Sequence, residues 1–386
     1  MSHYLDYAAT SALRPPAVAE AMARFVLECG ASPGRGGHEP ALEAGRLALR
    51  CRQALQRLLG LAGDPGRIAF MHNATHALNT ALWGVLRRGD AVVVTAYDHN
   101  AVLRPAAFLA RERGIDVRMV PGTREGEIDY DVVERQLQGA RLLALNCASN
   151  VLGHRLPLRP LTELARAAGA LVLLDTAQGA GHFPLDCGAL GADLVAFTGH
   201  KGMLGPQGTG GLWVREGVEV EPLVRGGTGG DSTRREMPDA MPDRLEAGTV
   251  NAPGVVGLDA GIRFVLERGV DAIHAHELRL KRRLREGLGA LHCVAVRSPA
   301  GEDGAGIVTL TAETLDPAAL AQRLDAEWGV QGRAGLHCAP ECHRLLGTVE
   351  TGALRLSVGW ASTDEDVDRA LEGLEALTMP GRPGRT

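Results

Sequence analysis

Short apolar segments alternate with helical patterns along the first two thirds of the chain. The apolar segments lie at 67–70, 91–95, 117–120, 142–145, 171–174, 194–197 and 209–214. Between most of them, polar and apolar positions follow the 3.6-residue period of an amphipathic helix. Strands separated by helices predict a largely parallel sheet with helices on both faces, which is the α/β class.

The last predicted strand breaks this alternation. Residues 209–214 follow the glycine-rich turn 205–211, which is too short for the helical crossover that a parallel neighbour needs. We therefore predict an antiparallel partner for this strand and a mixed, mostly parallel, seven-stranded sheet. The polar, proline-bearing segment 226–243 predicts a long surface loop.

The last third of the chain has a different pattern, in which helices dominate at first. Its predicted elements are helices from 253 to about 291, strands near 294 and at 307–310, a helix at 317–328 and a strand at 354–358. This pattern predicts a smaller α+β domain. We expect residues 15–252 to form the large domain, and residues 1–14 and 253–386 to form the small one.

Composition and charge exclude several classes of protein. The 386 residues are 45% apolar and 23% charged, as in a globular protein, and the net charge of −5 gives no electrostatic reason to expect nucleic acid. No apolar segment approaches the ~18 residues that cross a bilayer. The seven cysteines have no repeated spacing, which favours reduced thiols. We expect a cytoplasmic protein that binds neither nucleic acid nor membrane.

A lysine stands where a buried strand is predicted to end. Lys201 follows the strand that ends at Phe197 and precedes the glycine-rich turn. Burial lowers the pKa of a lysine and makes its amine a nucleophile for carbonyl groups. A solvated surface lysine is the alternative interpretation.

Two further candidates also lie at predicted strand ends. Asp175 follows the strand at 171–174, at the edge where open α/β sheets bind ligands, and Thr75 begins a helix whose unpaired amides could hold a phosphate. Each has a plainer alternative, since Asp175 could cap a following helix and Asn73 or Thr75 could be an N-cap. Neither glycine fingerprint of a nucleotide site is present.

Taken together, these three motifs and the segment 97–105 resemble the class V aminotransferase family of fold-type I pyridoxal-phosphate enzymes. The resemblance covers nearly the whole chain, beginning at 4–11, continuing through 34–38 and ending at 354–359. It implies the fold-type I architecture and pyridoxal 5'-phosphate as cofactor. A carboxylate beside the pyridinium nitrogen keeps that ring protonated, so that it acts as an electron sink.

The resemblance implies a role for each cofactor contact. Lys201 would bond covalently to the cofactor, Asp175 would pair with the pyridinium nitrogen, and His99 would stack on the ring. Gln178 would hydrogen-bond the ring hydroxyl. The phosphate contacts would be Ala74, Thr75, Thr198, His200 and, from a second subunit, Thr249. A homodimer is therefore expected.

The family also implies where an amino-acid substrate binds. Arg355 would clamp the substrate carboxylate, because a guanidinium matches a carboxylate with two parallel hydrogen bonds. Asn150 would lie near that carboxylate and the ring oxygen, and Arg333 and His38 would be further substrate contacts. If the resemblance to the family is set aside, Arg355 is better interpreted as a strand residue that points to solvent.

Within this family, residues 333–340 resemble the short catalytic-loop motif of cysteine desulfurases and selenocysteine lyases. A thiol is needed there because a thiolate can attack the sulfur of the substrate. The resemblance implies that Lys201 removes the α-proton of L-cysteine, Cys338 takes the sulfur as a persulfide, and alanine leaves. His99 could move the thiol proton. A small buried hydrophobe is the alternative for Cys338.

Other interpretations stay open. His337, Cys338, Cys342 and His343 are close enough to suggest metal, but the spacing is unlike a zinc motif, so no metal is expected. Cys342 could resolve a persulfide, although packing is the better interpretation. The compact loop resembles desulfurases that pass sulfur to a separate acceptor protein. A selenocysteine lyase, another C–S lyase or aminotransferase, and a non-enzymatic protein of this fold are the alternative functions.

Overall fold

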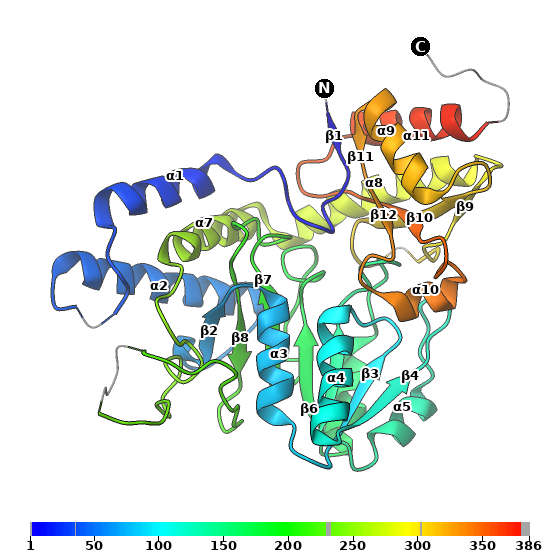
Figure 1. Cartoon of the computed structure of the whole chain (residues 1–386). Helices are drawn as coiled ribbons and strands as arrows, with labels where there is room; N and C mark the ends of the chain where they lie inside the picture. Colours follow the sequence, from blue (N-terminus) through cyan, green and yellow to red (C-terminus); the bar gives the residue numbers. More distant parts are fainter. Residues whose placement is uncertain (1, 35, 229–232, 302, 380–386) are drawn as a thin grey trace.

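The larger part of the protein is built on a seven-stranded sheet (Figure 1). The computed structural model describes residues 2–34, 36–228, 233–301 and 303–379, so Arg35 of the 34–38 motif lies outside the described residues. In spatial order the strands are β2 (Ile68–Met71), β8 (Gly210–Val214), β7 (Leu194–Thr198), β6 (Leu171–Asp175), β5 (Leu142–Asn146), β3 (Ala91–Thr95) and β4 (Asp116–Val120). Each lies within about one residue of its predicted position.

The predicted mixed sheet is confirmed. Strands β4, β3, β5, β6 and β7 pair in parallel, whereas β8 is antiparallel to both β7 and β2. The short turn before β8 imposes this direction because it leaves no room for a crossover helix. The described part of the predicted loop 226–243 contains neither helix nor strand.

Helices cover both faces of this sheet, which explains why its strands, except the edge strand β4, are apolar without alternation. Val93 packs with helices α2 (Glu39–Leu59), α5 (Tyr130–Leu137), α6 (Leu158–Ala167) and α7 (Ala252–Arg268) on one face. Val92 and Val94 pack with α3 (Ala74–Val85) and α4 (Asn100–Arg113) on the other. Successive side chains of a strand point to opposite faces, and here both faces are core.

The C-terminal part has a four-stranded antiparallel sheet, as expected for an α+β unit. Its strands in order are β12 (Arg333–Gly335), β13 (Ala353–Ser357), β10 (Ile307–Ala312) and β9 (Val294–Val296). Apolar side chains of α8 (Val270–Gly289), α9 (Pro317–Trp328) and α11 (Asp364–Thr378) form its core. The short helix α10 (Pro340–Leu346) follows β12 and was not predicted.

The N-terminus joins this C-terminal part. Strand β1 (His3–Tyr4) pairs in parallel with β11 (Val330–Gln331), and Asp6 bridges to Ser357. Helix α1 (Pro16–Arg24), the π-helical turn η1 (Phe25–Cys29) and the 3₁₀ turn η2 (Pro65–Arg67) complete the described elements. Helix α7 packs against α1 and α2, and the domain boundary at 253 stays a prediction. No helix within the described ranges is long and apolar enough to span a membrane.

Candidate active site

A cavity of about 250 Å³ lies at the carboxyl ends of the central strands, beneath the C-terminal part. Most of the residues predicted for the site line it, namely Ala74, Thr75, His99, Asn150, Asp175, Gln178, Thr198, His200, Lys201, Arg333, Cys338 and Arg355. Parallel strands end at one edge of a sheet, so side chains that follow different strands converge there. The structure thus gathers at one place residues more than 270 positions apart along the chain, from Ala74 to Arg355.

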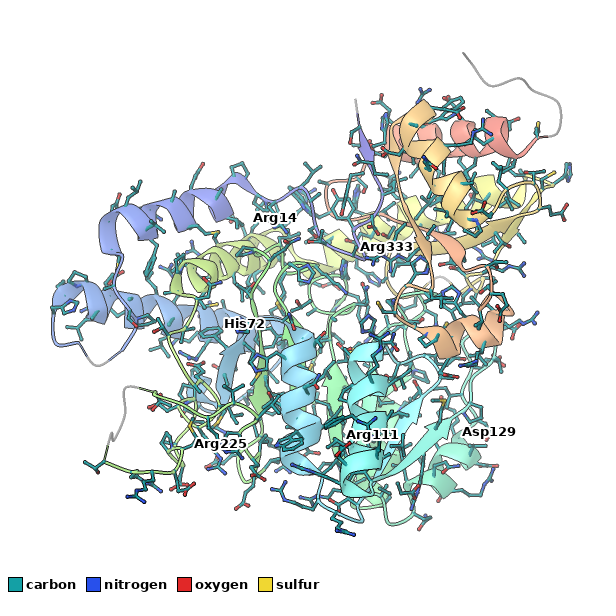
Figure 2. The ribbon with its side chains drawn as sticks, viewed as in Figure 1. Arg14, His72, Arg111, Asp129, Arg225 and Arg333 are labelled. Carbon is teal, nitrogen blue, oxygen red and sulfur yellow. The ribbon has the colours of Figure 1, made fainter. Side chains whose placement is uncertain are left out.

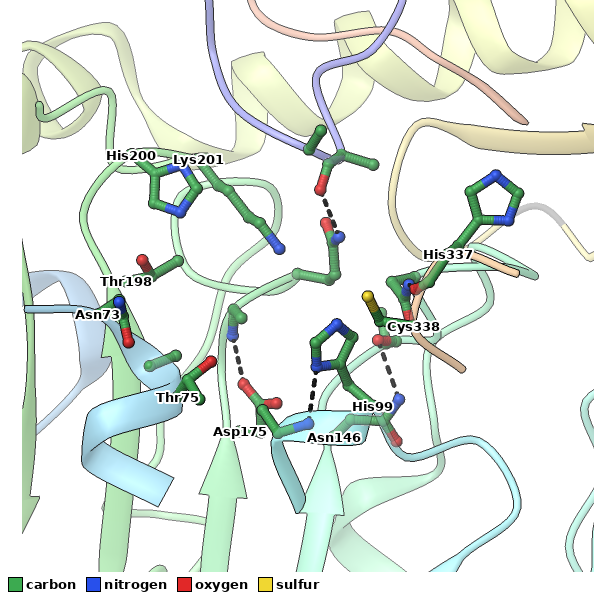
Figure 3. A pocket seen from close by; sticks show the side chains of 18 of the residues that line it. Asn73, Thr75, His99, Asn146, Asp175, Thr198, His200, Lys201, His337 and Cys338 are labelled. Atoms are coloured by element: carbon green, nitrogen blue, oxygen red, sulfur yellow. Dashed lines mark hydrogen bonds between the residues drawn. The ribbon is translucent and has the colours of Figure 1, made fainter. Parts of the chain in front are cut away.

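Lys201 enters the cavity from the segment that follows β7. Figure 3 shows its amine directed into the cavity from one side, with Cys338 approaching from the other. The side chain faces the cavity yet is enclosed by protein, and burial lowers the pKa of its amine to about 8, although the charge of Asp175 acts in the opposite direction. The interpretation of Lys201 as a solvated surface lysine is therefore wrong.

Asp175 ends β6 and is almost fully buried. One carboxylate oxygen accepts a hydrogen bond of 2.9 Å from the Ala177 amide, and turns rather than a helix follow. The helix-cap interpretation is thus wrong. Burial raises the pKa of Asp175, while the Ala177 amide and the charge of Lys201 oppose that rise.

The turn into α3 presents donors to the cavity. The Asn73 side chain accepts the His76 amide at 2.9 Å, which makes Asn73 the N-cap. The amides of Ala74 and Thr75 belong to the first helical turn, where no intrahelical acceptor exists. Together with the positive end of the helix dipole, they suit a phosphate or another anion.

Several buried polar atoms around the cavity have no hydrogen-bond partner among the described residues. They are Thr198 Oγ1, Asn146 Oδ1, Asn150 Oδ1, Gln178 Oε1 and Arg355 Nε. An unsatisfied buried polar group costs about 1–3 kcal/mol, so native proteins keep few of them. Their concentration at one cavity indicates a polar ligand. Asn146 was missed from the sequence, although its place at the end of β5 is a signal of the same kind as that of Asp175.

His99 is the N-cap of α4, and this fixes its tautomer. Its Nδ1 accepts a hydrogen bond of 3.0 Å from the Ala101 amide, so the neutral ring carries its proton on Nε2. Burial lowers the pKa of His99 to about 4. A ring whose Nδ1 lone pair is engaged and whose Nε2 carries the proton is poorly suited to accept a thiol proton from Cys338, whereas it suits stacking and donation from Nε2.

Arg355 lies in the middle of β13 and is only 2% exposed. Its Nη1 donates to the Asn150 carbonyl oxygen at 3.0 Å and its Nη2 donates to Asp6 at 2.9 Å. The interpretation of Arg355 as a residue that points to solvent is therefore wrong. The N-terminal segment carries Asp6 to the site, which gives the distant motif at 4–11 a physical role.

Cys338 is exposed on a turn with unusual backbone geometry. His337 and Cys338 have φ angles of 50° and 57°, a left-handed conformation that costs about 1–2 kcal/mol per residue outside glycine. Two hydrogen bonds from the larger part of the protein hold this turn. Asn150 Nδ2 donates to the His337 carbonyl oxygen at 2.6 Å, and the Asn100 backbone amide donates to the Cys338 carbonyl oxygen at 2.7 Å. The interpretation of Cys338 as a buried hydrophobe is wrong.

Cys342 contrasts with Cys338, because it is fully buried on α10. Burial raises the pKa of its thiol to about 12, and its sulfur lies 3.9 Å from the Ser149 hydroxyl. This environment favours the packing interpretation over a resolving thiol. Over the ranges that the structure describes, no group of three or more His, Cys, Asp or Glu side chains is placed to hold a metal ion.

Of the three remaining predicted residues, one lies at the cavity and two lie outside it. Arg333 is exposed at the cavity rim, where the C-terminal part meets the larger one (Figure 2). His38 is not at the cavity, because its ring caps α2 by accepting the Ala41 amide. Thr249 is exposed beside His72 and His76, in a separate cavity. A contribution of His38 or Thr249 to a site requires another copy of the chain.

The chain is similar to known proteins over nearly its whole length. The class-V aminotransferase family matches residues 3–370. A protein of Methanothermobacter thermautotrophicus named "Probable cysteine desulfurase" is 33% identical, and the match covers 98% of this chain and 95% of that protein. A "Cysteine desulfurase" of Klebsiella pneumoniae is also 33% identical, and the match covers 97% of this chain and 93% of that protein. The structure of a cysteine desulfurase from Thermococcus onnurineus superposes with a TM-score of 0.91 at 33% identity, and the superposition covers 98% of this chain and 94% of that one.

Proposed function

Because the chain belongs to the class-V aminotransferase family, we propose that it is a pyridoxal-phosphate-dependent cysteine desulfurase that converts L-cysteine to L-alanine. The observation that carries this proposal is the placement of a lysine with a lowered pKa and an exposed cysteine at one cavity. The lysine suits a carbonyl cofactor, and the cysteine suits an acceptor of sulfur. Full-length relatives named for the same activity support it.

The residues at the cavity fit pyridoxal 5'-phosphate. Unpaired amides at the start of α3, a buried carboxylate and an amine with a lowered pKa match its phosphate, ring nitrogen and aldehyde. The residues that would hold it are Lys201, Asp175, His99, Gln178, Ala74, Thr75, Thr198 and His200. When bound, the cofactor withdraws electrons from the α-carbon of an amino acid and weakens its bonds.

The chain's own residues supply the proton transfers and the sulfur acceptor. Lys201 Nζ is neutral in a substantial fraction near pH 8 and takes the α-proton of L-cysteine. The Cys338 thiolate then attacks the substrate sulfur, so that the S–S bond forms, the C–S bond breaks and the electron pair stays on carbon. A proton delivered to this β-carbon and the return of the proton from Lys201 to the α-carbon together give alanine, and Cys338 keeps the sulfur as a persulfide.

Substrate orientation falls to Arg355 and Asn150. Arg355 Nε has no partner among the described residues and Nη2 is paired with Asp6, so a substrate carboxylate competes with Asp6 for the guanidinium. The unpartnered Asn150 Oδ1 lies at the same cavity, while the Asn150 amide nitrogen holds the cysteine-bearing turn. This arrangement links substrate binding to the position of Cys338.

The direct test is product formation from L-cysteine. We expect the holoenzyme with a thiol reductant to release alanine and sulfide in equal amounts, measured by amino-acid analysis and a sulfide assay. The proposal fails if neither product appears with any sulfur acceptor tried. L-selenocysteine in the same assay identifies a selenocysteine lyase, which would form alanine from that substrate alone.

We also propose a homodimer in which Thr249 reaches the cofactor phosphate of the partner subunit. Exposed apolar side chains on η1 and α2, namely Val26, Leu27, Leu42 and Leu49, offer a surface for such an association. A thiol-bearing acceptor protein would then take sulfur from the exposed Cys338. The cytoplasmic location stays a prediction.

Mixed dimers test the contribution of Thr249. Thr249→Ala is expected to weaken cofactor binding about tenfold, because one charge-assisted hydrogen bond is lost. When this variant is mixed with Lys201→Ala, a dimer of the two contains one intact site if Thr249 acts across the interface. We expect turnover to be regained on mixing. A mixture no more active than its parts would place Thr249 outside the partner's site.

A further inference from the structure

Behind the turn that bears Cys338, a line of hydrogen bonds runs away from the cavity. His337 Nε2 lies 3.0 Å from the Arg333 carbonyl oxygen, and His337 Nδ1 lies 3.2 Å from His343 Nε2. His343 Nδ1 lies 2.8 Å from the Thr348 hydroxyl. Resting on the proposed function, we propose that His343 and Thr348 are positioning residues that hold this turn in the geometry needed for sulfur transfer.

We call the hydrogen-bonded series Arg333 carbonyl–His337–His343–Thr348 the relay. The donor and the acceptor of each of its hydrogen bonds follow from the Arg333 carbonyl at one end. A carbonyl oxygen only accepts, so His337 Nε2 carries the proton, and Nδ1 of the neutral ring must accept. His343 Nε2 therefore donates to His337, and His343 Nδ1 accepts from the Thr348 hydroxyl. Burial lowers the pKa of His337 to about 3 and that of His343 to about 4, which keeps both rings neutral.

The relay is buried and rigidly placed. His343 is fully buried and Thr348 is 3% exposed, and the two imidazole rings stack with centroids 5.4 Å apart. Thr348 follows the glycine cap of α10, and its amide donates to the His343 carbonyl at 2.9 Å. The segment after it leads into β13, which carries Arg355. The relay thus connects the cysteine turn to the strand of the substrate-binding arginine.

The turn needs support from this side because its conformation is unfavourable. Among the described residues, hydrogen bonds from the larger part of the protein reach only the carbonyl groups of His337 and Cys338, through Asn150 and Asn100. The relay holds the side chain of His337, which Figure 3 shows directed away from Lys201. Without it, the turn can relax toward negative φ and displace the Cys338 sulfur. A displacement of about 1 Å is enough to reduce a rate about 100-fold.

Thr348→Val provides the test, because it replaces the hydroxyl with a methyl group of similar size. We expect kcat for alanine formation by the holoenzyme to fall about tenfold, with KM for L-cysteine changed less than about twofold. Thr348→Ser restores the donor and is expected to recover most of the rate. The matched control Thr378→Val removes another buried hydroxyl, at the end of α11, and should leave kcat unchanged.

Three results overturn the proposal. The first is a wild-type kcat in Thr348→Val. The second is a loss of kcat that is fully explained by less bound cofactor or less folded protein. The third is a failure of Thr348→Ser to recover the rate. His343→Gln must show the same selective loss of kcat as Thr348→Val.

The relay itself is tested without activity, by ¹⁵N spectra of histidine-labelled protein. We expect His337 and His343 to be protonated on Nε2 only, and the His337 signals to shift in Thr348→Val although the two side chains do not touch. A proton on His337 Nδ1 overturns the relay. Wild-type protein that forms no alanine instead overturns the proposed function, and the two failures are thereby distinguished.

Discussion

Lys201→Ala is expected to lose the covalently held cofactor and to reduce turnover of L-cysteine at least about 1000-fold. In the proposed mechanism the amine is both the attachment point and the base for the α-proton, and no other amine lines the cavity among the described residues. The measurement is borohydride reduction followed by peptide mass analysis, which should find the cofactor on Lys201 in the wild type. Covalent cofactor in Lys201→Ala would contradict the assignment.

Lys281 offers a matched control for this substitution. It is also buried, its pKa is also lowered to about 8 by burial, and it lies on α8 away from the cavity. Lys281→Met should therefore keep the cofactor bound. The pH dependence adds a second criterion, because only the neutral amine attacks an aldehyde. Cofactor uptake by apoprotein should accelerate as the pH rises through about 8, where Lys201 loses its proton.

The second large effect is expected for Cys338→Ser, which should reduce sulfide release at least about 100-fold while the cofactor stays bound. A serine hydroxyl is not ionised at neutral pH and does not accept sulfur, whereas the rest of the site is unchanged. In the wild type, intact-protein mass spectrometry after L-cysteine without reductant should show one added sulfur atom, which is absent from the variant.

Two other cysteines serve as controls for Cys338. Cys29→Ser removes a partly exposed thiol outside the cavity and should leave the rate unchanged. Cys342→Ala removes the buried thiol on α10 and should lower stability more than kcat. If Cys338→Ser releases sulfide at the wild-type rate, sulfur leaves by elimination and the persulfide mechanism is wrong.

The large sheet was predictable from the sequence because all its strands except the edge strand β4 are buried on both faces. Such strands appear as continuous apolar segments, for example 91–95, and their carboxyl ends then identify Asp175 as a ligand-facing residue. Strands β1 and β11 were missed for the opposite reason. Each has only two residues, too few for any periodicity, and they pair across almost the whole chain.

The roles of individual side chains depended on contacts that no local pattern contains. Arg355 looks like a solvent-facing strand residue until Asp6 and the Asn150 carbonyl are placed against it. The tautomer of His99 follows from the Ala101 amide, which the folded start of α4 places against Nδ1. The relay behind Cys338 requires a turn, a helix and a loop to pack together.

The sequence by itself determined which residue types carry the chemistry and the order of strands and helices that brings them to one edge. Periodicity and strand ends are local properties, and a short segment is enough to display them. The tertiary structure alone decided which of these groups are buried, which nitrogen of each histidine carries the proton, and where the Cys338 thiol points. Burial is set by partners from distant parts of the chain, because desolvation arises only when those parts pack together. The direction of each histidine hydrogen bond is set by neighbours within six residues, but only the folded backbone brings those donors and acceptors against the ring.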